Sequence, residues 1–503
     1  MEIVSNLLIG FGTALNQTNL FYCFLGVLLG TLVGVLPGIG PPGAIALLLP
    51  ITFHLSPVAA TILISGIYYG AMYGGSTTSI LVNIPGEAAS VVTCLDGYKM
   101  ARKGRAGPAL GIAAFASFIA GSFSLIFLMA LAPVLSDMAL KVGPPEYFSL
   151  MCLGMMILVV LVRGSALKAL AMILLGLLVS YVGMDMVTGR MRFTYGVPEL
   201  ADGIGLVPVV MGLFGISEVL SSLDESEEVS VFKTKIRNLF PSLQDWKDSI
   251  FPILRGSIIG FFIGILPGPG STISTFTSYG IEKKLSRHPE KFGTGAIEGV
   301  AGPESANNAA ASGTFIPLFT LGLPSHPVMA LLMGALMIHG LQPGPLLMIQ
   351  HKEIFWGTVA AMYMGNVMLL ILNLPLIGLW VRVLRIPRKI LFPLIVLFCL
   401  TGSYSLNSSI FDVGVMFFFG LVGYFCNRYD FEAAPMIMAF VLGPMFERSL
   451  RQSLISSRGS FRVFWDSPIA MVSFSILAAL LIWGGVRRVR MKHSAEKQGS
   501  RQG

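Results

Sequence analysis

An apolar, glycine-rich segment in the first half of the chain reads Gly26-Val-Leu-Leu-Gly30-Thr-Leu-Val-Gly34-Val-Leu-Pro37-Gly38-Ile-Gly40. A second copy reads Gly256-Ser-Ile-Ile-Gly260-Phe-Phe-Ile-Gly264-Ile-Leu-Pro267-Gly268-Pro-Gly270, with the five glycines and the Leu-Pro displaced by 230 residues. Each copy predicts an apolar helix that ends abruptly at Leu-Pro-Gly-x-Gly. Proline lacks an N–H and disfavours helix in the residue before it, and glycine permits positive φ. Interrupted apolar helices in two related halves of a membrane protein indicate a central binding site, whereas the simpler alternative is a structural kink.

Composition places the chain in a lipid bilayer. Of its 503 residues, 54% are apolar and 12% are charged, whereas a soluble domain carries about a quarter charged residues. No apolar segment shows the alternation of a membrane β-strand. We therefore expect an all-α polytopic membrane protein with about 10–12 transmembrane or re-entrant helices. The clearest segments are Ala109–Pro133, Tyr147–Val162, Leu167–Val182, Ile204–Leu220, Phe355–Val381, Ile390–Thr401, Val413–Phe425 and Ile469–Val486.

Basic residues gather in short connections and at the C-terminal end. The formal net charge is +8, and lysine and arginine cluster in residues 99–105, 233–247, 283–291, 382–389 and 487–501. Such clusters mark cytoplasmic loops rather than a nucleic-acid surface. We therefore place the C-terminus in the cytoplasm and expect no nucleic-acid partner. The first 90 residues contain no lysine or arginine, so the rule leaves the side of the N-terminus open, and we expect no removable signal peptide.

The duplication divides the chain into two halves. We assign residues 1–222 to a first membrane repeat, 223–250 to a cytoplasmic linker, 251–490 to a second membrane repeat and 491–503 to a cytoplasmic tail. Glu218 and Glu447 end similar apolar stretches of the two halves, 229 residues apart.

Loop charges bear on how the halves are related. The connection after the first broken helix, residues 52–57, has no lysine or arginine, whereas residues 282–291 after the second have four. Inverted repeats produce such opposed bias, and we expect inverted repeats with broken helices at the centre. Loops on one side that merely differ in charge are the alternative.

An uncharged polar element follows each broken helix. The first half has Tyr73-Gly-Gly-Ser-Thr-Thr-Ser-Ile-Leu-Val-Asn-Ile-Pro85-Gly86, and the second has residues 302–314 followed by Leu321-Gly-Leu-Pro324-Ser325-His326-Pro327. Hydroxyl, amide and free backbone N–H groups donate to a carboxylate, and their oxygens bind Na⁺. The structural alternative is that small polar residues hold helices together. The candidate substrate-binding residues are Gly38, Gly40, Ser76, Thr77, Thr78, Ser79, Asn83, Gly268, Gly270, Ser271, Thr272, Asn307, Asn308, Ser325 and His326.

A few ionisable residues lie near these elements. Charge inside a membrane is expensive and marks function by default. Glu304, beside the asparagine pair, is our candidate for binding a coupling cation, Na⁺ or H⁺, together with Asn307 and Thr314. Glu87 and Glu298 fit the membrane edge, where a solvated side chain is equally expected. His326 has an unperturbed pKa close to neutral pH, but a hydrogen-bonding role is an equal alternative.

Cysteine and histidine usage argues against other chemistry. The five cysteines are isolated in sequence, which predicts no disulfide and no metal site. None of the six histidines has HExxH-like or paired spacing. A membrane-embedded enzyme, the alternative class, needs a nucleophile with a base or a metal set, so we predict no catalytic residue and no cofactor besides the coupling cation.

Nearly the whole chain resembles the large membrane subunit of the tripartite tricarboxylate transporter family. The most specific string is Glu298-Gly-Val-Ala-Gly-Pro-Glu-Ser-Ala-Asn-Asn308. Other resembling segments are residues 73–81, Asn83-Ile-Pro-Gly86, Asp96-Gly-Tyr98, Gly340-Leu-Gln-Pro-Gly-Pro345 and Glu447-Arg-Ser-Leu-Arg-Gln-Ser-Leu454.

The resemblance implies a secondary transporter subunit in the bacterial inner membrane. Its expected partners are a small four-helix membrane subunit, a periplasmic substrate-binding protein, the lipid bilayer and a citrate-like tricarboxylate or another organic carboxylate, taken up with an ion gradient. Where the family commonly has Leu-Gly-Ile-Pro-Gly-Ser, this chain has Leu-Gly-Leu-Pro-Ser325-His326, which puts citrate itself in doubt. A channel that needs no binding protein is a further alternative.

Overall fold

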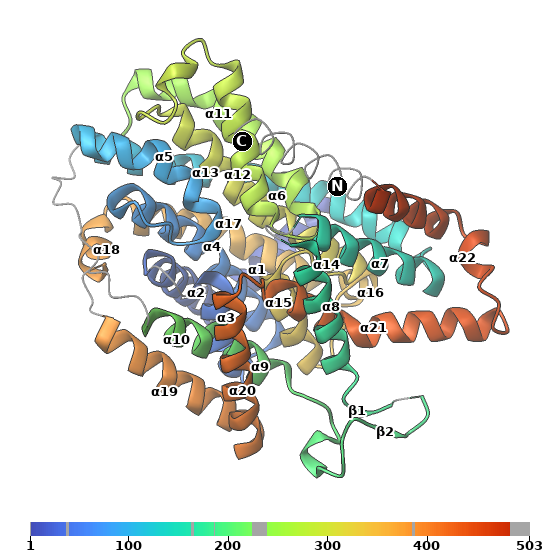
Figure 1. Cartoon of the computed structure of the whole chain (residues 1–503). Helices are drawn as coiled ribbons and strands as arrows, with labels where there is room; N and C mark the ends of the chain where they lie inside the picture. The colour runs from blue at the N-terminus through green and yellow to red at the C-terminus, as the bar shows by residue number, and fades with distance from the viewer. Residues whose placement is uncertain are drawn as a thin grey trace, which may run out of the picture.

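The computed structural model describes residues 2–36, 40–161, 165–185, 187–223, 239–384 and 388–482, which are almost entirely helical (Figure 1). Within these ranges, eight helices or continuous helix runs are long and apolar enough to cross a membrane, and further apolar helices of 10–17 residues accompany them. The predicted all-α class is confirmed. The basic tail, residues 487–501, lies outside the described residues.

The first half contains ten helices and one small hairpin within the described ranges. They are α1 (Glu2–Ala14), α2 (Gln17–Val35), α3 (Gly40–Thr52), α4 (Pro57–Val82), α5 (Val91–Met100), α6 (Ala106–Ala139), α7 (Pro144–Leu161), α8 (Ala166–Ser180), β1 (Gly183–Met184), β2 (Met191–Arg192), α9 (Leu206–Val210) and α10 (Ser217–Leu223). A 3₁₀ turn, Ala88–Ser90, precedes α5, and a π-helical segment, Met211–Ile216, joins α9 to α10.

Helices α11 to α22, followed by an apolar helix over Pro468–Ile482, form the second half as far as it is described. They are α11 (Leu243–Ile265), α12 (Gly270–Leu285), α13 (Glu298–Gly313), α14 (Phe315–Leu321), α15 (Pro327–Ile338), α16 (Pro345–Gln350), α17 (Lys352–Asn373), α18 (Ile377–Val383), α19 (Arg388–Asn407), α20 (Ile410–Arg428), α21 (Ala434–Ser456) and α22 (Val463–Asp466).

Two predicted boundaries differ from the structure. The segment predicted over Phe355–Val381 is two helices, because α17 ends at Asn373, two residues before Pro375, and proline disfavours helix in the residue that precedes it. Helix α11 begins at Leu243, inside the range assigned to the linker. Most of that range, residues 224–238, lies outside the described residues.

Both predicted helix breaks are present. Helix α2 ends at Val35, Leu36 is extended, and α3 begins at Gly40 with φ 62°. Helix α11 likewise ends at Ile265 and α12 begins at Gly270. Gly268 between them has φ 123°, a conformation that side chains rarely adopt. Pro37, Gly38 and Ile39 lie outside the described residues.

The glycine stripes have the same packing role in both halves. A Cβ atom at Gly30 of α2 would lie 2.3 Å from the carbonyl oxygen of Ile67 on α4, and one at Gly260 of α11 would lie 2.2 Å from that of Ala306 on α13. Their neighbours in each stripe, one helical turn away on either side, meet carbonyls in the same way. Close backbone approach of this kind drives helix pairing in lipid, so the duplicated sequence specifies a duplicated helix pair.

Later helices are exchanged between the halves. Helix α6 of the first half packs on α11 and α13, whereas α17 of the second half packs on α2 and α4. The last helices exchange as well: α21 packs on α8, seen side by side in Figure 1, and the run from α9 to α10 packs on α20. The two halves therefore share one interlocked core. Their inverted relation remains a prediction from the loop charges.

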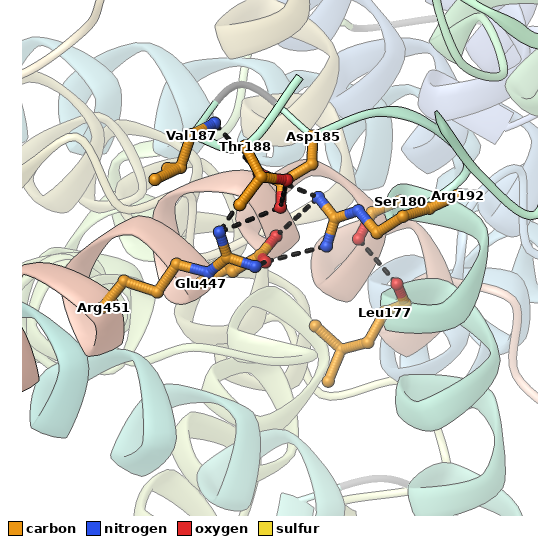
Figure 2. A network of polar contacts seen from close by, with 8 residues as sticks. All are labelled: Leu177, Ser180, Asp185, Val187, Thr188, Arg192, Glu447 and Arg451. Carbon is orange, nitrogen blue, oxygen red and sulfur yellow. Dashed lines mark hydrogen bonds and ion pairs between the residues drawn. The ribbon is translucent and has the colours of Figure 1, made fainter. Parts of the chain in front are cut away.

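An ion-pair network holds the β1–β2 hairpin to α21 (Figure 2). Arg192 Nη1 lies 2.8 Å from Glu447 Oε1, and Arg451 lies 2.7 Å from Glu447 Oε1 and 3.0 Å from Asp185 Oδ2. Hydrogen bonds from the Val187 N–H and the Thr188 hydroxyl hold the pKa of Asp185 well below its usual range. The two neighbouring arginines, Arg451 and Arg192, lower this pKa further. Asp185 is therefore charged at neutral pH. Glu447, which ends the apolar stretch of the second half in the sequence comparison, here pairs with Arg192 and Arg451 and so connects the hairpin to α21.

Candidate functional site

The two broken helices meet at a cavity of about 410 Å³. The N-terminal ends of α3, α12, α15 and α21 line it, together with the turn before α5. The lining residues are Gly40, Pro41, Pro42, Met72, Pro85, Gly86, Glu87, Ala88, Leu158, Phe214, Gly268, Pro269, Ser271, Thr272, His326, Pro327, Glu432, Ala434 and Pro435. No lysine or arginine is among these described residues. Since helix N-termini carry partial positive charge, such a cavity suits an anion. The lining residues Pro41, Pro42, Pro327 and Pro435 have no N–H, so their helices contribute the dipole rather than donors at these positions.

Volume alone does not single out this cavity. Two other cavities have volumes of about 470 and 530 Å³. Neither is lined by a predicted site residue or by a Leu-Pro-Gly element. The 410 Å³ cavity brings together five predicted residues from both halves, Gly40, Gly268, Ser271, Thr272 and His326.

Not every glycine predicted as a donor is free to bind a ligand. The N–H of Gly268 donates to the Ser325 carbonyl at 2.9 Å, and that of Gly270 donates to the Gly268 carbonyl at 2.8 Å. This corrects the expectation that these two N–H groups hold a carboxylate. The next two N–H groups of α12, on Ser271 and Thr272, have no backbone acceptor, because the first turn of a helix lacks carbonyl partners.

The polar residues of α4 point in different directions. Ser76 donates to Glu304 Oε2 at 2.5 Å, Thr78 donates to the Val35 carbonyl at 2.7 Å, and Ser79 donates to the Gly75 carbonyl at 2.9 Å. Thr78 thus satisfies a carbonyl that the break after α2 leaves open. Asn83 ends α4 in the left-handed conformation and is exposed. None of Ser76, Thr77, Thr78, Ser79 and Asn83 lines the 410 Å³ cavity.

Glu304 is the centre of a second polar cluster. Its carboxylate accepts hydrogen bonds from Ser76 and from Thr93, and its side chain is buried. Asn308, one turn further along α13, donates to Ser117 Oγ at 2.7 Å. Beside the cluster lies a cavity of about 10 Å³, close to the space that one water molecule needs. The cluster therefore joins α4, α5, α6 and α13 across the two halves.

Asn307 belongs to a different set of contacts and reaches the 410 Å³ cavity only through the lining residue Glu87. Its Nδ2 donates to Glu87 Oε1 at 2.9 Å, while its Oδ1 is buried without a hydrogen-bond partner in the described structure. Glu87 Oε2 also accepts from the Ala89 N–H at 2.8 Å. From the sequence, Glu87 is expected at the membrane edge. In the structure its carboxylate lines the cavity and accepts a hydrogen bond from Asn307 of α13.

The hairpin tip of the second half also lines the cavity. His326 lines it, and its ring stacks on Tyr68 with centroids 5.4 Å apart. Ser325 does not line the cavity, since its hydroxyl donates to the Thr314 carbonyl at 3.4 Å. Thr314 itself donates to the Ala311 carbonyl. Tyr68 and Ser271 lie near each other, yet neither hydroxyl has a partner in hydrogen-bond geometry.

Sequence reasoning missed Glu87, Tyr68 and Glu432 as site residues. A usable signal existed for Glu87, because it follows Pro85-Gly86 as His326 follows Pro324-Ser325. Tyr68 lies in an apolar run, and nothing in its sequence neighbourhood distinguishes it. Among the described residues, no group of three His, Cys, Asp or Glu side chains is placed to hold a metal ion.

Comparison with known proteins places these features in a family. A family model described as the tripartite tricarboxylate transporter TctA family matches residues 20–438. An Agrobacterium vitis protein, described as an uncharacterized 52.8 kDa protein in the TAR-I ttuC' 3' region, is 51% identical over 492 residues, 98% of each chain. Another from that organism, described as an uncharacterized protein in the TAR-II ttuC' 3' region, is 53% identical over 211 residues, 42% of this chain and 87% of the relative.

No solved structure matches the chain. The family match contains both glycine repeats, both polar elements and every described residue of the cavity. This chain therefore belongs to the tripartite tricarboxylate transporter TctA family, whose members are transporter subunits that work with other tripartite components.

Proposed function

We propose that this chain is the membrane subunit of an ion-gradient-driven importer for a tricarboxylate or a related organic carboxylate. A periplasmic binding protein delivers the substrate, and a small four-helix subunit completes the complex in the bacterial inner membrane, with the C-terminus in the cytoplasm. The observation that carries the proposal is the 410 Å³ cavity, where helix N-termini from both halves meet without a lysine or arginine among the described lining residues.

The chemistry of the cavity fits a carboxylate that must be released again. Each helix N-terminus contributes about half a positive charge, worth roughly 0.3–1 kcal/mol toward an anion. The hydroxyls of Ser271 and Thr272 add neutral donors. Several weak attractions hold an anion without the fixed, tight pairing that a buried arginine provides. Because both broken helices line this one cavity, we expect the site to lie between the halves, as in other transporters with discontinuous helices.

Uptake into sealed vesicles tests the proposal. Proteoliposomes that contain this chain and its small subunit are given the binding protein and radiolabelled citrate or a panel of dicarboxylates and tricarboxylates. We expect accumulation only when binding protein and an inward Na⁺ or H⁺ gradient are both present. Turnover of a carboxylate in detergent, where no gradient exists, would contradict the proposal, as would uptake that ignores the binding protein.

Replacement of Glu304 by Gln tests the coupling cluster. We propose that the buried Glu304 carboxylate takes part in coupling, whereas Asn307 and Thr314, which the sequence grouped with it, contact Glu87 and the Ala311 carbonyl instead. Gln keeps one oxygen to accept from Ser76 or Thr93 but removes the charge, so we expect the cation or pH dependence of uptake to change. The measurement is the initial uptake rate against Na⁺ concentration and against pH. If both profiles match those of the wild type, Glu304 takes no part in coupling.

A further inference from the structure

The two hairpin tips beside the cavity occupy equivalent places in the two halves. Helix α4 ends at Asn83 with φ 64° and ψ 25°, and α14 is followed by Gly322 with φ 67° and ψ 23°. Four residues beyond each, Glu87 and His326 are extended and cap the next helical turn. Each accepts the backbone N–H two residues ahead, at 2.8 Å for Glu87 and 3.3 Å for His326. Glu87 and His326 are 239 residues apart in sequence. Ile67 and Ala306, whose carbonyls face the two glycine stripes, have the same separation.

Each tip contacts the central helix of the other half. Glu87 accepts from Asn307 of α13, and His326 stacks on Tyr68 of α4. Tyr68 and Asn307 are themselves 239 residues apart, so the two pairs are equivalent in backbone position. Their chemistry differs, because one pair is a carboxylate with an amide and the other an imidazole with a phenol. The two pairs are thus alike in backbone and different in charge.

The acidic side of the cavity opposes the binding of an anion. A carboxylate substrate in this cavity approaches Glu87 in a low-dielectric setting, where repulsion between like charges is strong. No arginine or lysine among the described lining residues offsets it. A cation bound at Glu87 removes the repulsion, and the two ligands then favour each other's binding. Such mutual dependence is what coupling requires.

The unpaired oxygen of Asn307 indicates which atoms would bind that cation. The Oδ1 atom of Asn307 is buried and has no hydrogen-bond partner among the described residues, although its Nδ2 already donates to Glu87. A buried acceptor without a donor is uncommon in a folded protein. A hard cation such as Na⁺ takes carboxylate and amide oxygens as ligands. A Na⁺ ion bound beside Glu87 and Asn307 pairs with the Asn307 Oδ1 and also neutralises the Glu87 carboxylate.

We propose that Glu87 and Asn307 form the binding site for the coupling cation, and that this cation is Na⁺. The inference rests on the proposed function, since it identifies the ion that moves with the carboxylate. Protonation of Glu87 neutralises the charge but leaves the Asn307 oxygen unpaired. If the Asn307 amide rotates so that its Oδ1 accepts the proton of Glu87, its Nδ2 loses the Glu87 carboxylate as its acceptor. Na⁺ is the cation that accounts for both atoms.

Equilibrium binding of ²²Na⁺ tests the site without any carboxylate. The full-length chain is reconstituted in proteoliposomes, and bound ²²Na⁺ is measured for the wild type, Glu87→Gln and Asn307→Ala. We expect saturable binding to the wild type and at least about tenfold weaker binding to both variants, because ligand charge and oxygen count set the affinity of such sites. Two variants in different segments of the chain guard against a folding failure in either one.

Glu146→Gln is the matched control. Like Glu87, Glu146 accepts one backbone N–H, from Gly143, and one side-chain donor, from Ser467, but it does not line the cavity. We expect it to bind ²²Na⁺ like the wild type. No saturable ²²Na⁺ binding to the wild type, or wild-type binding in either cavity variant, overturns the inference. Carboxylate uptake is a separate measurement, so loss of uptake with an intact Na⁺ site would refute the proposed function alone.

Discussion

Replacement of Asn307 by Leu is expected to reduce carboxylate uptake roughly 10- to 150-fold. Leucine is close to asparagine in size, but it removes the Nδ2 donor from Glu87 and the Oδ1 acceptor beside it. Loss of a hydrogen bond to a charged group costs about 1.5–3 kcal/mol, which gives that range. The measurement is the initial rate of uptake in proteoliposomes, normalised to the amount of inserted protein.

Asn373→Leu is the control for this change. Asn373 is also a buried asparagine on a membrane helix, and its Oδ1 likewise lacks a hydrogen-bond partner in the described structure. Its Nδ2, however, donates to a backbone carbonyl of its own helix, that of Leu369 at 2.9 Å, rather than to a carboxylate. Its loss is expected to cost only about 0.6 kcal/mol, the average for polar contacts between membrane helices, and most uptake is retained. Uptake that is equal in Asn307→Leu and the wild type removes Asn307 from the site.

The helix breaks could be predicted because their cause is local. Leu-Pro-Gly-x-Gly combines a residue without an N–H and residues that tolerate positive φ, and both effects act within a few bonds. The structure accordingly ends α2 at Val35 and α11 at Ile265, as the sequence indicated. The glycine stripes were equally readable, since spacing by four places them on one face of a helix.

The exchange of helices between the halves could not be predicted. In lipid, an apolar helix has no single hydrophobic face that identifies its partner, and the sequences of α6 and α17 are mostly apolar. Only the structure shows that α6 packs on α13 and α17 on α4. This exchange brings Ser117 to Asn308, a contact that sequence spacing does not contain.

The site was predicted in part because helical geometry divides consecutive residues. Ser76, Thr77, Thr78 and Ser79 follow one another in α4, and each residue turns the side chain by about 100°. Four such side chains cover the whole circumference and cannot face one cavity. The structure accordingly directs Ser76 to Glu304 and Thr78 to the Val35 carbonyl. The residues at helix starts, Gly40, Ser271 and Thr272, line the cavity instead.

Gly260→Ala is expected to destabilise the protein by about 1–3 kcal/mol, the usual cost of adding a methyl group to a close-packed interior. The new Cβ atom would lie 2.2 Å from the Ala306 carbonyl oxygen and 2.7 Å from its Cα, so α11 and α13 must separate. Because α13 carries Asn307, which holds the cavity-lining Glu87, separation also displaces that carboxylate, and we expect uptake to fall with stability. Thermal unfolding in detergent and uptake in proteoliposomes measure the two effects.

Gly280→Ala supplies the comparison on the neighbouring helix α12. No atom lies within 4 Å of a Cβ built at Gly280, so the same substitution there adds helix propensity of up to about 1 kcal/mol without a clash. The duplication extends the prediction: Gly30→Ala on α2, where the Ile67 carbonyl oxygen lies 2.3 Å from the new atom, should act like Gly260→Ala. If Gly260→Ala and Gly280→Ala unfold at the same temperature, close approach of the helix pair does not stabilise the core. If only one of the two stripes is sensitive, the repeated sequence does not have a repeated energetic role.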